Sequence, residues 1–394
     1  FASGCASSGT ETRRGGAVDG QYAFWPLAPD EPRVQFLKSF VVSSDVQPRK
    51  RSNLDTLIFG SESEEVAAID KPSGVAMSKG RIYVCDIRKE AVVVFDVAAR
   101  QMRIMGSSGV NRLGNPVDIC IADDGMIYVA DNSRNAVIEF TPKERYSRAL
   151  GRSGMRPTAV AVGNGRVYVS DGAGQKILIL DRSSGEVVGE FGSAGDGEGQ
   201  FRFPLGLDVD REGRVNVVDF MRCRVQRFTP DGAFIDGFGE LGDYAGAFAK
   251  PKHMTVDSEG IIYVVDSAFQ NVQLFNDDFR MLMHFGSAGD YPGAMNLPMG
   301  VCTSDDDIEL FADLIHPGFD ARRLVVVTNQ FGDQKVSLYA LGQLRDGWTV
   351  AQVSASSLEV PSGMGENAES RRLQASGDEP EPLPEEEEPS TQPR

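Results

Sequence analysis

The stretch PKHMTVDSEGIIYVVDSAFQNVQLF, residues 251–275, decides the fold because it is one of six related copies. Each copy opens on a proline, continues through a short apolar run and a turn, and ends a second apolar run on Asp or Asn. The prolines are separated by 44, 41, 47, 47 and 47 residues: Pro72, Pro116, Pro157, Pro204, Pro251 and Pro298. A period in the forties with several short strands per unit is typical of a propeller blade. The sequence therefore predicts an all-β fold, a six-bladed β-propeller.

Within the fifth copy we expect four strands, at residues 254–256, 261–265, 271–275 and 280–285. The residue that ends the second strand recurs in all six copies: Asp86, Asp131, Asp171, Asp219, Asp266 and Asn329. A ring of equivalent side chains suits a structural role, in which each oxygen accepts N–H groups of the following corner. Acid–base catalysis would need one or two specially placed carboxylates instead.

The sixth copy lacks a good fourth strand. Its strands are expected near residues 299–303, 324–328 and 336–339, after which the chain turns polar. The alternating segment RVQFLKSF, residues 33–40, precedes the first copy, and we expect it to supply the missing strand and close blade six. The propeller is predicted to occupy residues 24–350. An insertion at 305–323 lies between the first two strands of blade six, so we expect it on the face of the propeller opposite the corners that follow the second strands. It could dock on a partner, cap the channel or pack on its own blade.

The two ends differ from the repeats. Residues 1–23 contain FASGCASSG, in which small residues before Cys5 resemble the lipobox of bacterial lipoproteins, although Ala2 stands where Leu is usual. This resemblance implies a trimmed signal peptide, a lipidated Cys5 and a flexible tether to the outer membrane. The alternative is a cysteine without a role. Residues 351–394 are rich in Pro and Glu, so we predict a disordered acidic tail.

Charge narrows the choice of partners. The 394-residue chain carries a net charge of −17. Residues 352–394 hold ten Asp or Glu against three Arg, a charge of −7, so −10 remains on the rest. A body this acidic is not expected to bind a phosphate backbone, which excludes nucleic acid as a partner. No apolar run reaches the roughly 18–20 residues of a membrane helix, so we expect membrane attachment through the lipid anchor alone.

The repeats resemble those of NHL-repeat six-bladed propellers over residues 34–341, through phrases such as IYVAD (127–131) and FGSAG (191–195). WPLAPDEPRVQFLKSF (25–40) and HPGFDARRLVVVTNQ (316–330) resemble more particularly a bacterial envelope lipoprotein branch of that family. Members of that branch are found beside multihaem cytochromes, which implies a scaffold or accessory subunit among envelope proteins. The chain has no C-x-x-C-H motif, so we expect it to carry no haem and no other cofactor.

Two residues are weak candidates for a metal or proton site. Asp118 and His253 each lie two residues after the proline of their copies, which places both near the channel mouth. The resemblance to peptidylglycine lyases implies zinc histidines directly after that proline in several blades, but those positions hold Ser73, Val117, Thr158, Leu205, Lys252 and Met299. A lactonase-like site would need Glu, Asn and Asp around one metal. We therefore predict no catalytic residue and no metal. The alternative is a metal-dependent channel-mouth enzyme, lyase or lactonase-like, using Asp118 and His253.

Four cysteines besides Cys5 lie on strands or in a corner: Cys85, Cys120, Cys223 and Cys302. Their spacing leaves one or two disulfides and buried free thiols equally open.

The corners after the second strands offer a binding surface. Blades four, five and six present Phe220, Phe269 and Phe331 there, whereas blades one and two present Arg88 and Arg134. Aromatic residues on three consecutive blades have the composition of a protein-binding patch, and we assign all five residues to it. The alternative is that each ring tucks between its neighbouring blades. The sequence therefore predicts a monomeric, non-catalytic binding or scaffold propeller.

Overall fold

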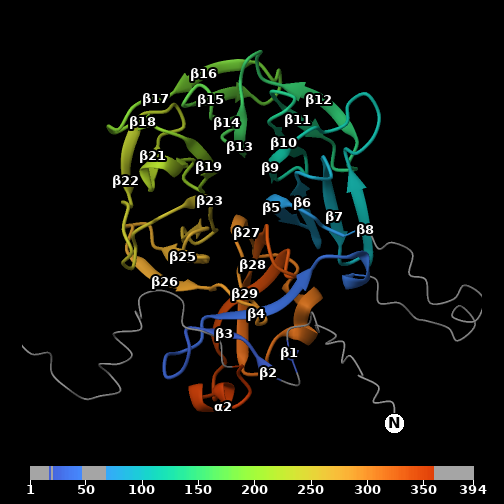
Figure 1. The fold of residues 1–394 in the computed structure, drawn as a ribbon, viewed down its shortest axis with the longest axis vertical. Coiled ribbons are helices and arrows are strands. Elements are labelled where there is room, and N and C mark those ends of the chain that lie inside the picture. The colour runs from blue at the N-terminus through green and yellow to red at the C-terminus, as the bar shows by residue number, and fades with distance from the viewer. Residues whose placement is uncertain (1–16, 19–20, 47–67, 359–394) are drawn as a thin grey trace, which may run out of the picture.

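The structure is a computed structural model that describes residues 17–18, 21–46 and 68–358. Six antiparallel sheets are arranged as blades around a central channel (Figure 1). Blade one contains β5 (Pro72–Ser78), β6 (Arg81–Asp86), β7 (Ala91–Asp96) and β8 (Gln101–Met105). Blade two contains β9 (Pro116–Ile121), β10 (Ile127–Asp131), β11 (Ala136–Phe140) and β12 (Tyr146–Leu150).

The next three blades repeat this order. Blade three contains β13 (Pro157–Gly163), β14 (Arg166–Asp171), β15 (Lys176–Asp181) and β16 (Val187–Phe191). Blade four contains β19 (Pro204–Val209), β20 (Val215–Asp219), β21 (Arg224–Phe228) and β22 (Phe234–Phe238). Blade five contains β23 (Pro251–Val256), β24 (Ile262–Asp266), β25 (Asn271–Phe275) and β26 (Met281–Phe285). The predicted six-bladed propeller is confirmed.

Blade six is closed by the N-terminal strand, as predicted. Its sheet runs from β27 (Pro298–Ser304) through β28 (Phe319–Asn329), β29 (Val336–Leu344) and β4 (Val34–Phe40) to β3 (Phe24–Trp25). Strand β4 pairs antiparallel with β29, with Phe40 opposite Val336 and Val34 opposite Leu341. The two ends of the repeat region therefore lie in one sheet, and the ring has no open edge at this point.

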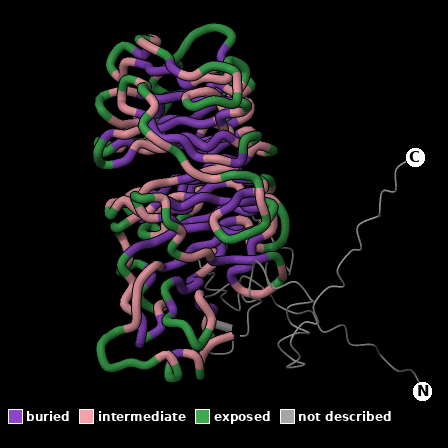
Figure 2. Tube along the Cα trace, turned by 90° about the vertical axis from the view of Figure 1, so that its left-hand side faces the viewer, coloured by how far each residue is buried: buried purple, intermediate pink, exposed green. Residues whose placement is uncertain are grey.

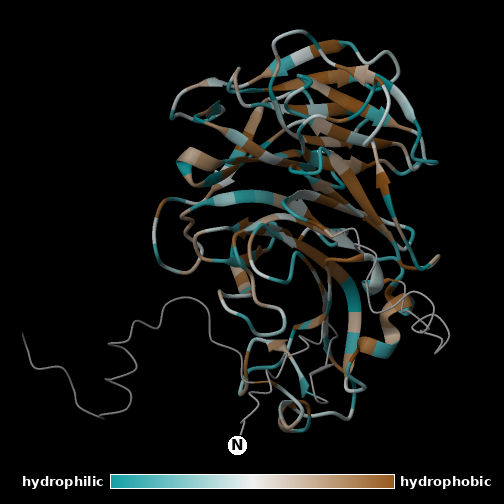
Figure 3. Cartoon of the chain, turned by 45° about the vertical axis from the view of Figure 1, so that its right-hand side comes forward, coloured by the Kyte–Doolittle hydropathy of each residue, from teal (hydrophilic) through white to brown (hydrophobic). Residues whose placement is uncertain are grey.

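The core lies between the blades. The first strand of each blade contacts the first strands of both neighbours, so β5, β9, β13, β19, β23 and β27 surround the channel (Figure 1). Buried positions concentrate along the strands, and exposed positions fall mainly in turns and corners (Figure 2). The strands are correspondingly the most hydrophobic parts of the ribbon (Figure 3). Burial on both faces explains why second strands such as β10 and β24 read as continuous apolar runs in the sequence.

The insertion in blade six packs on its own blade. It forms a 3₁₀ helix, η3 (Ile308–Leu314), whose Phe311 is buried in a cluster with Phe24 and Leu37. Strand β28 begins at Phe319, five residues earlier than the expected start at 324, because residues 319–323 continue the pairing with β29. Of the three outcomes left open by the sequence, the structure shows packing against the blade.

Short elements complete the chain: β1 (Ala17–Val18), β2 (Gln21–Tyr22), η1 (Ser43–Asp45), β17 (Ser193–Ala194), β18 (Gln200–Phe201), η2 (Phe220–Arg222) and α2 (Val350–Ser354). No helix in the described ranges is long and apolar enough to cross a membrane. Helix α2 lies beyond the predicted boundary at residue 350. It is ordered because Thr349 caps it and Val353 is buried against the core, and Leu358 then donates its N–H to the Tyr22 carbonyl at 2.7 Å.

Candidate functional site

The acidic residues that end the second strands are structural, as predicted. Asp86 accepts N–H groups from two directions: from Asp70 at 2.7 Å, just before the inner strand, and from Arg88 at 3.0 Å, in the corner. Asp266 repeats this arrangement with Ala249 and Ala268 at 2.7 and 2.8 Å. Each carboxylate therefore fastens a corner to the start of the inner strand of its own blade. We call the face where these contacts gather the upper face.

The channel narrows near the upper face because small residues bring the inner strands together. The second position after each inner-strand proline holds Gly74, Asp118, Ala159, Gly206, His253 and Gly300. A Cβ atom at Gly74 would lie 2.5 Å from the Cα of Asp118, and one at Gly206 would lie 2.8 Å from the Cα of His253. Only glycine permits this approach, so the layer contracts until its two large side chains meet.

Asp118 and His253 form a bridge between blades two and five. The Nε2 of His253 lies 3.1 Å from Oδ1 of Asp118, and the Asp118 side chain is almost fully buried. The other oxygen, Oδ2, accepts the N–H of Val160 at 2.9 Å. The sequence placed both residues in one layer, and the structure adds that they touch. Both functional atoms of Asp118 are thereby engaged by the protein itself.

The electrostatics favour a charged bridge. Burial lowers the pKa of His253, but the Asp118 carboxylate opposes this by charge and by hydrogen bonding, and Asp208 adds to it. The net result is a His253 pKa above the ordinary value of 6.5. The Nδ1 atom is buried and has no hydrogen-bond partner of normal geometry in the described part of the chain. His253 thus serves mainly to hold Asp118 across the channel.

We expect the bridge to make the stability of the ring depend on pH. Because the pKa of His253 is raised on folding, the bridge stabilises fully below about pH 6.5, and this contribution is lost as pH rises through the folded pKa. The free energy of unfolding in urea is measured from about pH 5 to about pH 9 for the parent and for His253→Gln. The difference between the two should shrink as pH rises. A difference that stays constant would contradict the charged bridge.

Beyond the bridge, away from the upper face, the channel holds a cavity of about 160 Å³ lined by all six inner strands. Its polar side chains include Cys120, Asp208, Thr255 and Cys302. Asp208 accepts hydrogen bonds from the Thr255 hydroxyl at 2.9 Å and from the Val256 N–H at 2.8 Å, while burial raises its pKa. Burial also raises the pKa of both thiols, which opposes thiolate formation. The four cysteines in the described ranges are free.

A metal centre is not assembled around the bridge. Among residues 17–18, 21–46 and 68–358, no group of three or more His, Cys, Asp or Glu side chains is arranged to hold a metal ion. Zinc and calcium sites in proteins use at least three protein ligands, which are these side chains or carbonyl oxygens. The channel therefore offers a salt bridge, the Asp208 carboxyl group and two thiols whose pKa is raised.

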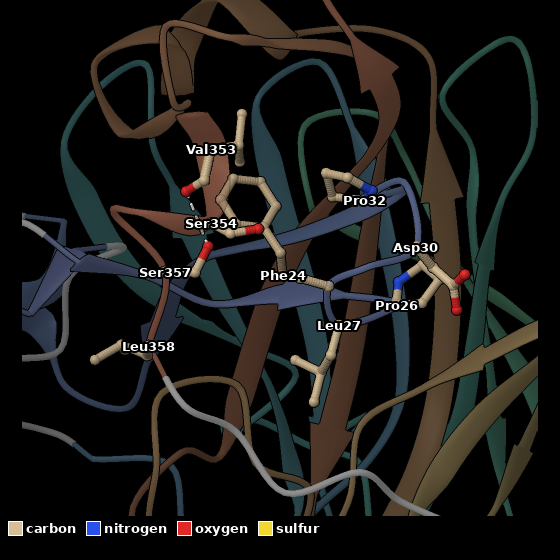
Figure 4. A pocket seen from close by; sticks show the side chains of 10 residues that line it. Phe24, Pro26, Leu27, Asp30, Pro32, Val353, Ser354, Ser357 and Leu358 are labelled. Carbon is tan, nitrogen blue, oxygen red and sulfur yellow. Dashed lines mark hydrogen bonds between the residues drawn. The ribbon is translucent and has the colours of Figure 1, made fainter. Parts of the chain in front are cut away.

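A second hollow, of about 400 Å³, lies outside the ring where the N-terminal segment meets the residues around α2 (Figure 4). Phe24, Leu27, Pro32 and Leu358 line it, and Asp30 is the one ionisable side chain among its lining residues. Ser354 and Ser357 also line it, and the Ser357 hydroxyl donates to the Val353 carbonyl at 3.0 Å.

Ser356 and His316, close to that hollow, do not form a nucleophile and base. The Nδ1 of His316 accepts the N–H of Gly318 at 2.9 Å, so the neutral ring carries its proton on Nε2, which faces the Ser356 hydroxyl at 3.0 Å. The hydroxyl in turn donates to the Val353 carbonyl. A general base would need a free lone pair facing the hydroxyl, and this contact lacks one.

The three predicted aromatic residues occupy corners of the upper face but differ in exposure. Phe331 is 62% exposed, whereas Phe220 and Phe269 are half-buried. The Phe220 ring packs edge-on against Phe203, with centroids 6.3 Å apart, and carries the Lys252 ammonium 4.0 Å above it. Tucking of the rings, the alternative left open by the sequence, therefore applies in part to Phe220 and Phe269 and not to Phe331.

Sequence reasoning missed three exposed residues of the same sector. Met221, Leu241 and Tyr244 are 65%, 74% and 52% exposed. Met221 is raised by the tight turn of η2, and the other two lie in the loop that links β22 to β23. For Leu241 and Tyr244 the available signal was a large side chain in a loop rich in Gly and Ala, residues 239–250. We call Phe220, Met221, Leu241, Tyr244, Phe269 and Phe331 the apolar surface.

The two predicted arginines lie on the upper face but outside this sector. Arg88 pairs with Asp70 at 3.1 Å, and Arg134 donates to the Arg112 carbonyl. Both therefore have partners within the corners of blades one and two. Cys5, the predicted lipidation site, lies outside the described residues.

Comparisons with known proteins support the fold and leave the family open. No family model matches the chain. A 78-residue stretch is 41% identical to E3 ubiquitin-protein ligase TRIM71 of Rattus norvegicus, and the same identity holds for the protein of Mus musculus. The match covers 20% of this chain and 8% of the relative, so the chain spans a small part of the curated proteins it matches.

Solved structures share the propeller fold at low sequence identity. A protein of unknown function from Bacteroides thetaiotaomicron aligns with a TM-score of 0.53 at 16% identity, over 71% of this chain and 72% of that one. A streptogramin B lyase gives 0.48 at 12% identity, over 70% and 84%, and a putative gluconolactonase gives 0.49 at 12%, over 70% and 90%. The likeness to the Bacteroides thetaiotaomicron protein supports the propeller fold and carries no assignment of activity.

Proposed function

We propose that this protein is a non-catalytic propeller of the NHL type that binds another protein through the apolar surface of blades four to six. The sequence resemblance suggests the setting: a lipoprotein of the bacterial cell envelope, anchored through Cys5, that serves as an accessory subunit beside a multihaem cytochrome complex.

The single observation that carries the proposal is the exposure of large side chains on one sector of the upper face. Met221, Leu241, Tyr244 and Phe331 are each more than half exposed. Met221 lies in blade four, Leu241 and Tyr244 lie in the loop that links blades four and five, and Phe331 lies in blade six. Of the other exposed apolar residues, five lie on outer strands: Ile104, Tyr146, Val188, Ile235 and Leu282. The remaining three are Val110 in the loop between β8 and β9, Leu310 on η3 and Trp348 before α2. A cluster of Met, Tyr, Phe and Leu on loops held by a rigid scaffold is the composition of a binding site for protein.

The channel supports binding over the metal-dependent enzyme considered as the alternative. That enzyme would use Asp118 and His253. These two side chains contact each other, and Asp118 also accepts the N–H of Val160. The glycine layer holds the inner strands together around the bridge, leaving little room for a substrate at this level. The side chains exposed on the upper face are therefore better placed to contact another molecule than Asp118 and His253 are.

Photo-cross-linking tests the proposal with a matched pair of positions. A photoreactive residue is placed at Phe331 or at Val188, which has the same 62% exposure but lies on the outer strand β16. In native membranes we expect one discrete adduct from position 331 and none from 188. The adduct should disappear when Met221→Ser and Leu241→Ser are added. Equal adducts from both positions, or an adduct indifferent to the serine substitutions, would contradict the proposal.

A further inference from the structure

The mouth of the channel on the upper face is ringed by basic residues. Lys71, Arg156 and Lys250 stand directly before the first residue of the inner strands of blades one, three and five. Lys252 follows on β23 itself. The six inner strands surround one channel (Figure 1) and all begin at this face, so these four residues lie at the same end of the channel.

These basic groups are not neutralised by the protein. Lys71, Arg156, Lys250 and Lys252 form no ion pair within the described ranges, and the first three are exposed. Three acidic residues of the same face pair with its arginines: Asp70 with Arg88, Glu90 with Arg112, and Asp196 with Arg202 and Arg222. Asp243, Asp290 and Asp333 are exposed in the outer loops of this face, so the concentration of basic residues is confined to the starts of the inner strands.

The positive charges are also crowded. Burial lowers the pKa of Lys252, and the neighbouring Lys250 lowers it further. The Lys252 ammonium rests 4.0 Å from the centroid of Phe220, which joins the basic mouth to the apolar surface. A bound anion would relieve the repulsion between the two lysines, so the site favours a negatively charged ligand.

We propose that this basic mouth binds a carboxylate-rich peptide, and that the peptide is residues 378–388 of the chain itself. This segment, DEPEPLPEEEE, holds seven carboxylates and no Lys or Arg. Its negative charge is complementary to that of the basic mouth. Leu383 supplies one apolar side chain, suited to the exposed Met221 beside the mouth.

The segment can reach the mouth. Nineteen residues, 359–377, separate it from Leu358. At roughly 3.3 Å per residue they span up to about 60 Å. The five strands of blade six, spaced about 4.8 Å apart, place the mouth about 20 Å inward from β3, and a strand adds about 20 Å of height. Tethering also raises the local concentration of the segment to the order of millimolar, so modest intrinsic affinity is sufficient.

Bound there, the segment would cover Phe220 and part of the apolar surface. It would act as an internal competitor that any partner has to displace. The role as a competitor rests on the proposed function, because it requires a protein partner. Binding of the segment to the mouth does not require one.

The test uses the full chain and a fluorescent peptide with the sequence of residues 377–390. In one protein, the seven carboxylates between Asp378 and Glu388 are replaced by Asn or Gln, which frees the mouth. We expect this protein to bind the peptide at least tenfold more tightly than the parent chain, whose own segment competes. Adding Lys250→Ala and Lys252→Ala should weaken binding at least tenfold, and raised salt should weaken it as well.

The matched control is Lys143→Ala with Arg145→Ala, two exposed, unpaired basic residues of the same spacing in the turn between β11 and β12 on the opposite face. These should leave peptide affinity unchanged. Equal binding by the parent and the neutralised chain would show that the mouth takes acidic peptides only from other molecules, which overturns the internal assignment. If the neutralised chain does not bind the peptide, the basic mouth is not the binding site. The same follows if the Lys250/Lys252 variant and the Lys143/Arg145 variant lose peptide affinity equally. Cross-linking from Phe331 remains a separate readout of the proposed function.

Discussion

Deleting residues 33–40, which include β4, is expected to prevent the ring from folding, although it removes a small part of the chain. Strand β4 fills the place of the fourth strand in blade six, and its Val34, Phe36, Leu37 and Phe40 are buried. Burial of each such side chain contributes about 1.5–3 kcal/mol, or roughly 6–12 kcal/mol together. This is comparable with the whole stability of an ordinary domain, about 5–15 kcal/mol. The deletion also leaves the edge of β29 unpaired, which invites aggregation.

The measurement is urea unfolding followed by circular dichroism, with gel filtration of the soluble fraction. Phe36→Ala should show an intermediate effect, a loss of about 3–5 kcal/mol, because it opens a cavity but keeps the strand. Deleting residues 6–13, a stretch of equal length outside the described residues, serves as the control and should leave unfolding unchanged. A deletion of 33–40 that still unfolds cooperatively near the parent midpoint would contradict closure by β4.

Arg323→Ala is expected to destabilise the protein by about 3–5 kcal/mol, because it leaves a buried carboxylate without its positively charged partner. Arg323, on β28 of blade six, reaches the turn of blade five and pairs with Asp257, whose side chain is fully buried. It also pairs with Asp305 and donates to the Ser258 hydroxyl at 2.7 Å. Tyr263 donates its hydroxyl to Asp257 at 2.8 Å. One guanidinium thus joins two blades on the face opposite the apolar surface.

The neighbouring residue provides the control for this substitution. Arg322 is 59% exposed at its side chain and pairs with Asp320 on the surface, so Arg322→Ala should change the free energy of unfolding by about 0.5 kcal/mol or less. Combining Arg323→Met with Asp257→Asn should recover much of the loss, since no charge then remains buried without a partner. An Arg323→Ala variant as stable as Arg322→Ala would show that this network does not hold the blades together.

Much of the fold could be predicted because the repeat fixes it locally. The proline at the start of each inner strand and the Asp at the end of the second strand mark each blade, and the missing fourth strand of blade six pointed to residues 33–40. Helix α2 was not predicted, and packing of η3 on its own blade was only one of three outcomes that the sequence left open. Both depend on contacts between segments far apart in the chain, such as Phe311 with Phe24, and no repeat reports these contacts.

The candidate sites were predictable only in part, for a similar reason. Asp118 and His253 could be placed in one layer from their positions in the copies, but their contact depends on how far glycines at 74, 206 and 300 let the strands approach. Phe331 was identified from its corner. Met221 and Leu241 were missed because exposure on a loop is decided by the path of the backbone, and residue type alone does not reveal it.

The central claim is that His253 and Asp118 form a structural bridge, so that the function of the protein lies on its surface. The most direct measurement is elemental analysis of the purified full chain and of its His253→Ala variant, each exposed to zinc and calcium and then desalted. We predict no stoichiometric metal in either protein. One tightly held zinc or calcium ion per chain, present in the parent and absent from the variant, would contradict the claim and make the channel a metal-dependent active site.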